Sequence, residues 1–292
     1  QGYLIGAPNK GLNAMFLLMN TARIAVGLQG LALIERAYQN SLAYARDRLQ
    51  MRSLSGAKRP DKPADPIIVH PDIRRLLLTQ KAFAEGGRVL AYYAYLQADI
   101  VAKSADEAER KRADELLGFL TPIVKAMLTE AAIECTNHAL QVFGGHGYVK
   151  EWGMEQFVRD ARITTIYEGT TQIQALDLLG RKIMGLQAAG LRHFLGEVGA
   201  FCQAQSGNPA LAEFVAPLAR LAQEWEQLTR EVGEAAMKDP EQVGAAAVDY
   251  LYYSGYVTLA YFWAREIAAL GPAHGEDFRA SKLATARFWY QR

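Results

Sequence analysis

The stretch LNAMFLLMNTARIAVGLQGLALIERAYQNSLAYARDR, residues 12–48, decides the fold class. Its mainly apolar stripe advances by alternating steps of four and three residues, which places the stripe along one face of a helix. The positions of this stripe are Leu12, Phe16, Met19, Arg23, Val26, Gly30, Leu33 and Ala37. The spacing therefore predicts one long helix that runs to Arg48.

The same spacing returns along most of the chain. Residues 51–69 are rich in proline, serine and glycine and are predicted to form a loop, after which residues 70–101 are predicted to form a second long helix. Further helical patterns, separated by glycine and proline turns, cover residues 191–204, 209–237, 242–269 and 278–289. No segment alternates with period two for long enough to predict a strand.

Local signals mark where the helices between these segments begin and end. Ser104 with Glu107 three residues later predicts a capping box, and Thr121 before Pro122 predicts a second helix start. The glycine pair at 144–145 predicts the end of that helix. We therefore expect an all-α protein with an antiparallel four-helix bundle in residues 1–186 and a second, additional helical domain in residues 187–292.

Composition excludes several classes of protein. The 292 residues carry 32 basic and 31 acidic side chains, so no field of one sign favours binding to nucleic acid or to a membrane surface. The longest apolar stretch, residues 24–34, is shorter than a bilayer span. The two cysteines, Cys135 and Cys202, form no disulfide framework, which favours a reducing, cytoplasmic compartment.

Two arginines fall where the helical stripe predicts burial. Arg23 lies on the stripe itself, and Arg48 lies on its continuation one turn after Tyr44. A buried guanidinium needs an anionic or polar partner, either within the chain as an ion pair or as a ligand bound in a groove. Both interpretations stay open at this point.

Residues 141–174 hold the densest group of candidate functional residues. Three glycines in four positions follow a predicted helix instead of a strand, so they are no dinucleotide fingerprint. Glu168 precedes Gly169 and Thr170, and Thr170 is placed to cap the next helix. The apolar residues just before Glu168 could raise its pKa, as a general base requires, although a surface glutamate at a helix entrance explains the pattern equally well.

No metal site is expected. Glu134, Cys135 and His138 lie on one predicted helix, but without a second ligand pair they are more typical of core and surface positions.

The motifs of residues 141–174 resemble a known family. Gln-x-x-Gly-Gly-x-Gly-Tyr from Gln141, Arg-Asp-Ala-x-Ile from Arg159 and Ile-Tyr-Glu-Gly-Thr-x-x-Ile-Gln from Ile166 are similar, in order and spacing, to the C-terminal signature of flavin-dependent acyl-CoA dehydrogenases. Residues 11–48 resemble the long helix that opens the C-terminal helical domain of this family. Residues 185–292 resemble the helical extension of longer bacterial members, such as the 3-methylmercaptopropionyl-CoA dehydrogenases.

The resemblance implies a catalytic role for one residue and binding roles for others. Glu168 would remove the α-proton of an acyl-CoA thioester while the β-hydrogen leaves as hydride to FAD, which gives a trans-2-enoyl-CoA. Asn20 and Arg23 would contact the substrate. The remaining positions would bind FAD, the first five from a neighbouring subunit: Arg48, Gln50, Gln141, Gly144, Gly145, Gly169, Thr170 and Gln172.

The resemblance also implies partners. An electron-transferring flavoprotein would accept the electrons, and the subunits would form a homodimer or a dimer of dimers. The chain resembles the C-terminal half of such an enzyme, so we expect it to be inactive alone. Two alternatives stay open: a non-catalytic relative that keeps FAD, and a helical assembly module.

Overall fold

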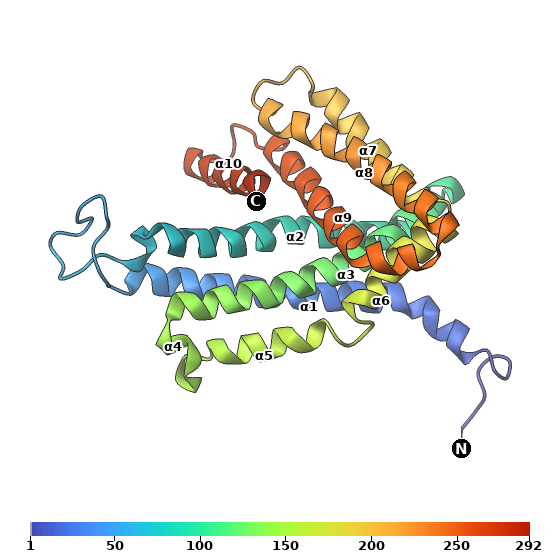
Figure 1. Cartoon of the computed structure of the whole chain (residues 1–292), viewed down its shortest axis with the longest axis horizontal. Helices are drawn as coiled ribbons and strands as arrows, with labels where there is room; N and C mark the ends of the chain where they lie inside the picture. Colours follow the sequence, from blue (N-terminus) through green and yellow to red (C-terminus); the bar gives the residue numbers. More distant parts are fainter. Residues whose placement is uncertain (1) are drawn as a thin grey trace.

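The computed structural model describes residues 2–292, without the side chains at positions 13, 14, 16 and 17. Four helices that alternate in direction form a bundle: α1 (Gly11–Asp47), α2 (Pro71–Lys103), α3 (Glu107–Phe143) and α5 (Met154–Thr164) (Figure 1). Within the described residues, the only extended pairing is an isolated bridge between Leu49 and Pro66. The predicted all-α fold and its antiparallel four-helix bundle are therefore confirmed.

Short helical turns connect the bundle helices. They are η1 (Ile67–Val69) before α2, and α4 (Gly145–Tyr148) and η2 (Lys150–Trp152) between α3 and α5. The predicted loop between the first two long helices is present, and α3 ends before Gly144, as the glycine pair predicts. Gly144 has a φ of +60°, which a glycine adopts without steric cost.

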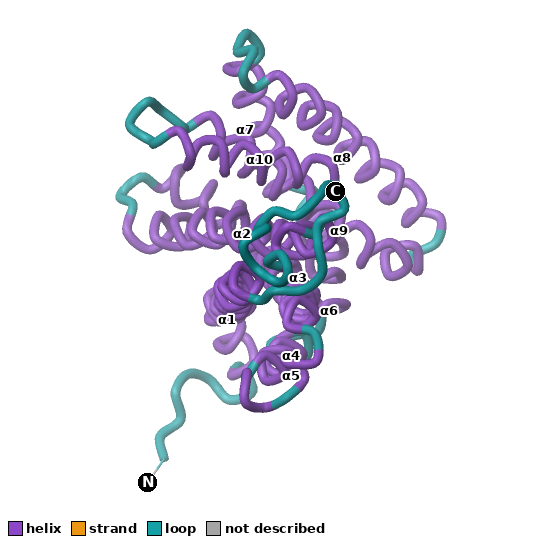
Figure 2. The backbone as a smooth tube through the Cα atoms, turned by 90° about the vertical axis from the view of Figure 1, so that its left-hand side faces the viewer, coloured by secondary structure: helices purple, strands orange, loops and turns teal. Residues whose placement is uncertain are grey.

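The second helical unit follows α6 (Thr171–Leu176) and a π-helical segment, η3 (Asp177–Gly185). It consists of α7 (Ala189–Gln205), α8 (Ala212–Lys238), α9 (Glu241–Ala268) and α10 (Glu276–Gln291). A view along the bundle shows these four helices on one side and α4 and α5 on the opposite side (Figure 2). Large side chains such as Phe119, Trp225 and Phe262 belong to one continuous core cluster that joins the two units.

One predicted helix start has a different capping residue, and a second predicted start is wrong. Asp106 caps α3 in place of Ser104, because its carboxylate accepts hydrogen bonds from the N–H groups of residues 108 and 109 at 2.8 and 3.3 Å. No new helix begins at Pro122, which lies inside α3. Its neighbours Leu120 and Ile123 are fully buried, so packing on both sides outweighs the backbone hydrogen bond that a proline cannot make.

Glycines on α1 allow this helix to approach α3 closely. A Cβ atom on Gly30 would lie 2.6 Å from the carbonyl oxygen of Leu128, and one on Gly27 would lie 3.0 Å from that of Val124. The apolar stripe therefore contains Gly30 for a steric reason. Among the other stripe positions, the side chain of Phe16 lies outside the described residues.

α3 is the central helix of the bundle. By length and composition it could cross a membrane, but 83% of its most apolar window is buried inside the protein. Its apolar character is therefore explained by its place in the core.

Candidate functional site

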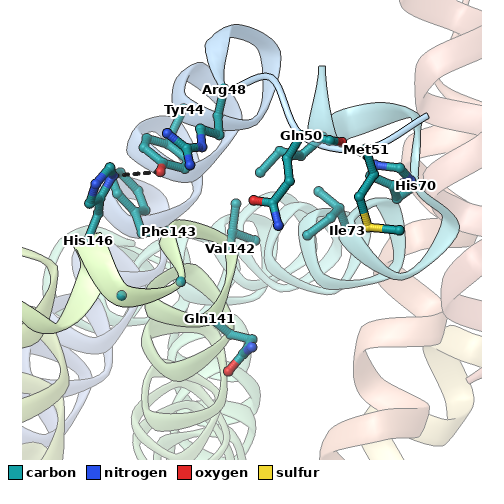
Figure 3. A pocket seen from close by; sticks show the side chains of 13 residues that line it. Tyr44, Arg48, Gln50, Met51, His70, Ile73, Gln141, Val142, Phe143 and His146 are labelled. Carbon is teal, nitrogen blue, oxygen red and sulfur yellow. Dashed lines mark hydrogen bonds between the residues drawn. The ribbon is translucent and has the colours of Figure 1, made fainter. Parts of the chain in front are cut away.

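One cavity of about 470 Å³ lies where the end of α1 meets the corner between α3 and α4 (Figure 3). Five of the residues predicted to bind a cofactor line it together: Arg48, Gln50, Gln141, Gly144 and Gly145. The side chains of the first three are largely exposed and thus available to a ligand. Residues that are more than 90 positions apart in the sequence therefore form one site.

The backbone after α1 forms one wall of this cavity. The Arg48 N–H closes the helix by donating to the Tyr44 carbonyl at 2.8 Å, and Arg48 itself is extended. The chain then pairs with the far side of the 48–66 loop, where Ile67 donates to the Arg48 carbonyl and Gln50 donates to the Asp65 carbonyl, both at 2.9 Å. This pairing fixes the backbone from which the Arg48 and Gln50 side chains extend.

The opposite wall is a tight corner that requires a glycine. Gly147 packs against α3 so closely that a Cβ atom would lie 2.5 Å from the Leu140 carbonyl oxygen. In contrast, a Cβ atom on Gly144 or Gly145 would meet no atom of the described residues within 4 Å. The glycine motif therefore has two functions: Gly147 permits the corner, and Gly144 and Gly145 leave open space beside their backbone.

An aromatic group that the sequence analysis missed completes this end of the bundle. Tyr44 stacks on Phe143 with ring centroids 4.1 Å apart, and its hydroxyl bonds the Nδ1 atom of His146 at 2.8 Å. His146 stacks in turn on Trp152 at 5.1 Å. The position of His146 inside the glycine motif was a usable signal, whereas nothing in the sequence indicates Trp152.

Glu168 lies at the opposite end of α5, in the turn that leads into α6. It is partly exposed and has a φ of +55°, while Gly169 after it has a φ of +90°. Thr170 caps α6 as predicted, since its side chain accepts from the Ile173 N–H at 3.4 Å. Glu168, Gly169, Thr170 and Gln172 therefore lie together around the start of α6.

The apolar residues before Glu168 do not enclose its carboxylate within this chain. The exposed fractions are 49% for Ile163, 47% for Ile166 and 37% for Tyr167. Ile173, which is 45% exposed, lies beside Gly169, so exposed apolar side chains stand on both sides of Glu168 in the sequence. The apolar surroundings that the sequence suggested for Glu168 are thus not formed by these side chains alone.

The two groups of predicted residues are far apart in one chain. The 11 residues of α5 separate them, which corresponds to about 16 Å at 1.5 Å per residue (Figure 1). A single copy of the chain does not bring Arg48 and Glu168 into one site.

Arg23 has an intramolecular partner. Its Nη1 atom lies 2.6 Å from Oδ2 of Asp177 in η3, and both side chains are almost fully buried. Arg181, which is mostly exposed, approaches the other Asp177 oxygen at 3.3 Å. Asn20, one turn before Arg23, lines a separate cavity of about 260 Å³ beside Lys182.

A buried carboxylate organises the loop that carries Gln50. Asp65 accepts hydrogen bonds from the N–H groups of Ser53, Lys58 and Arg59 at 2.7 to 2.9 Å and from the Arg52 guanidinium at 3.3 Å. The bond from Ser53, together with the others, lowers the pKa of Asp65 to about 2. The ionised carboxylate of Asp65 therefore holds several parts of this loop together through these hydrogen bonds.

We expect Asp65→Asn to loosen the loop, because its NH₂ group must replace one carboxylate oxygen and face N–H donors. Amide exchange at Ser53, Lys58 and Arg59 should become about tenfold faster at pH 7, the loss of one charge-assisted bond. Since the pKa of Asp65 is lower in the folded state, its stabilisation is present above pH ~4 and disappears as the pH falls to about 2.

Asp61→Asn is the matched control, because Asp61 is an exposed carboxylate of the same loop whose ion pair is with the Arg59 side chain. The role given to Asp65 would be contradicted by equal amide-exchange rates in the two variants at pH 7. It would also be contradicted if a difference between their rates persisted at pH 2.

Comparisons with known proteins agree with the motifs. The sequence profile described as "Acyl-CoA dehydrogenase, C-terminal domain" matches residues 9–184, and that described as "Acetyl-CoA dehydrogenase C-terminal like" matches residues 194–292. The chain is 41% identical to 3-methylmercaptopropionyl-CoA dehydrogenase of Ruegeria pomeroyi over all of its own length and 50% of the relative. It is 33% identical to the broad-specificity linear acyl-CoA dehydrogenase FadE5 of Mycobacterium tuberculosis, with 99% and 50% coverage.

Solved structures share the fold across both helical units. ACDH-11 of Caenorhabditis elegans, in complex with C11-CoA, superposes with a TM-score of 0.83 at 17% identity over 99% of this chain and 45% of that one. The acyl-CoA dehydrogenase of Bacillus anthracis, complexed with FAD, gives a TM-score of 0.73 at 18% identity, with 95% and 47% coverage. The chain spans about half the length of the curated relatives it matches. Because one family profile covers more than half of its residues, the chain belongs to the acyl-CoA dehydrogenase family, within the C-terminal helical region.

Proposed function

We propose that the protein that carries this chain is an FAD-dependent acyl-CoA dehydrogenase that converts an acyl-CoA thioester to the trans-2-enoyl-CoA. The observation that carries this proposal is the position of Glu168. Glu168 is partly exposed, in a left-handed backbone conformation directly before the capped start of α6, and the segments before and after it carry exposed apolar side chains. A general base must be reachable by its substrate, and exposed apolar side chains nearby suit an acyl chain.

In this proposal, the Glu168 carboxylate takes the proton from the α-carbon of the thioester. The Glu168 N–H donates no hydrogen bond to another described residue, so it is available to the thioester oxygen, where it would stabilise enolate charge. FAD, when bound, supplies the acceptor for the β-hydrogen and its electron pair. Proton and hydride together account for the two hydrogens lost by the substrate.

The cavity near Arg48 fits the adenosine diphosphate half of FAD. The Arg48 guanidinium suits a diphosphate, and the amides of Gln50 and Gln141 suit ribose and adenine. The open backbone at Gly144 and Gly145 lets a ligand approach closely. Gly169, Thr170 and Gln172 would hold the flavin half beside Glu168.

Because these two groups lie at opposite ends of α5, we propose that each FAD is held by two copies of the chain. A homodimer or a dimer of dimers satisfies this condition, and C2 pairs are the commonest assemblies. Asn20 is our proposed substrate contact, from the cavity that it lines with Lys182. Arg23 is a second proposed contact, although it is paired with Asp177 in this structure.

We also propose an electron-transferring flavoprotein as the electron acceptor and a division of the chain into a bundle domain, residues 1–186, and an extension domain, residues 187–292. The family profiles on either side of residue 186 support that division. The cytoplasm is the proposed compartment, supported by two cysteines that are both buried and free.

Colour provides the direct test of the reaction. The purified protein that carries this chain should be yellow, and saturated acyl-CoA thioesters should bleach it under anaerobic conditions, because the reaction reduces the flavin. A panel of acyl chain lengths then gives the substrate range. A yellow protein that no acyl-CoA bleaches would instead support the non-catalytic relative, and a colourless protein that does not take up FAD would overturn the proposal.

A further inference from the structure

The turn that carries Glu168 has an unfavourable backbone conformation. Glu168 and Gly169 are successive residues with positive φ values, +55° and +90°. A glycine adopts such angles without cost, but a glutamate rarely does. A non-glycine residue in this region keeps its conformation only where surrounding contacts determine it. The contacts that hold this turn therefore decide where the Glu168 side chain lies.

Two buried side chains bind the carbonyl groups of this turn. Gln174 of α6 donates from Nε2 to the carbonyl oxygens of Glu168 at 3.0 Å and Gly169 at 3.2 Å. Lys125 of α3 donates from Nζ to the same Gly169 oxygen at 2.8 Å. Both residues have no exposed surface. A Cβ atom at position 169 would lie 2.6 Å from the Gln174 Nε2 atom, so Gly169 leaves room for this contact.

Lys125 is unusual in its place on α3. It is fully buried between Val124 and Ala126 in the middle of the core helix. Burial lowers its pKa to about 8, although Glu130 and Glu168 oppose that shift and Arg23 adds to it. A methionine would fill similar space without the cost of desolvating an ammonium group. The hydrogen bond to the Gly169 carbonyl is the feature that an apolar side chain would lose.

We infer that Lys125 and Gln174 are positioning residues for the catalytic base: they clamp the Glu168–Gly169 turn against α3 and α6 and thereby fix the Glu168 carboxylate relative to the thioester. This inference rests on the proposed function, because it takes Glu168 as the base. Neither residue needs to touch substrate or cofactor for this role. Small displacements of a reacting group are enough to slow a reaction strongly, by about a hundredfold for 1 Å.

Lys125→Met tests the clamp with little change in side-chain volume. In the FAD-loaded protein, we expect flavin reduction by a saturating acyl-CoA to slow about ten- to a hundredfold, with the acyl-CoA Kd within about threefold of wild type. Amide exchange in residues 166–172 should become faster. Thr136→Val is the matched control, since it also replaces a buried polar side chain on α3, far from the turn, with an apolar one.

One series compares wild type with three variants: Lys125→Met, Gln174→Met and Glu168→Gln. Failure of the proposed base and failure of the clamp then give different results. Glu168→Gln at the wild-type rate would refute the proposed base and with it this inference. If flavin reduction is slow in Glu168→Gln but proceeds at the wild-type rate in Lys125→Met, the clamp is refuted and the proposed base is not. The clamp is also refuted if flavin reduction slows in Thr136→Val as much as in Lys125→Met, because the slowing would then result from disruption of the core.

Amide exchange decides the case in which Lys125→Met loses FAD. Gln174→Met keeps the buried lysine and removes the other donor. If Gln174→Met retains FAD, the clamp is supported by slower flavin reduction, an unchanged Kd for acyl-CoA and faster amide exchange in residues 166–172. Wild-type exchange in that segment for both variants overturns it, whatever their activity.

Discussion

Glu168→Gln should reduce its flavin at least about a hundredfold more slowly than wild type, while it keeps FAD and binds acyl-CoA. Glutamine preserves the shape of the side chain and a hydrogen-bonding end but cannot take a proton from the α-carbon. About a hundredfold is the lower end of the loss when a positioned general base is removed. Anaerobic stopped-flow reduction with a saturated acyl-CoA, beside flavin absorbance for cofactor content, measures both quantities.

The control for this experiment is Glu151→Gln, an exposed carboxylate in η2 at the other end of α5. It should reduce at the wild-type rate. If Glu168 only stabilises the entrance to α6, its replacement should lower the melting temperature and leave reduction unchanged. That pattern would remove Glu168 from the catalytic machinery and leave the role of the left-handed turn unexplained.

The sequence predicted the long helices well because buried side chains recur every three to four residues along most of their length, although Leu12 at the start of the α1 stripe is 63% exposed. The stripe of α1 includes Gly30, whose missing side chain the structure explains by the contact with Leu128 on α3. The wrong helix start predicted at Pro122 arose because a local signal was followed where tertiary packing decides. A proline is a strong local signal for a helix start, but the fully buried residues on both sides of it continue the helix through tertiary packing.

The site was predictable where a short motif contains it. The glycine corner and the residues around Glu168 are compact in the sequence, so their positions follow from two segments and a resemblance. Contacts between distant segments were not predictable. Lys125 is 44 positions from Gly169, and Asp177 is 154 positions from Arg23, so only the fold shows that these pairs meet.

The pair of Arg23 and Asp177 gives the second large expected effect, this time on stability. Asp177→Leu should lower the free energy of unfolding by about 3 kcal/mol, because it leaves the Arg23 guanidinium buried without an anion. The buried Nε atom of Arg23 already has no hydrogen-bond partner among the described residues. Arg23→Met should cost less, since the remaining Asp177 carboxylate keeps Arg181 as a second, more exposed partner at 3.3 Å.

The double variant Arg23→Met/Asp177→Leu separates the two interpretations of Arg23 that its sequence left open. If the ion pair is structural, the double variant should be more stable than Asp177→Leu alone and within about 1 kcal/mol of wild type, because no buried charge is left unpaired. Urea unfolding measures the cycle. If Arg23 contacts the substrate, Arg23→Met should also weaken acyl-CoA binding, an effect that the double variant cannot restore. Asn20→Ala supplies the comparison from one turn earlier on α1, because it affects the proposed substrate side without breaking the ion pair.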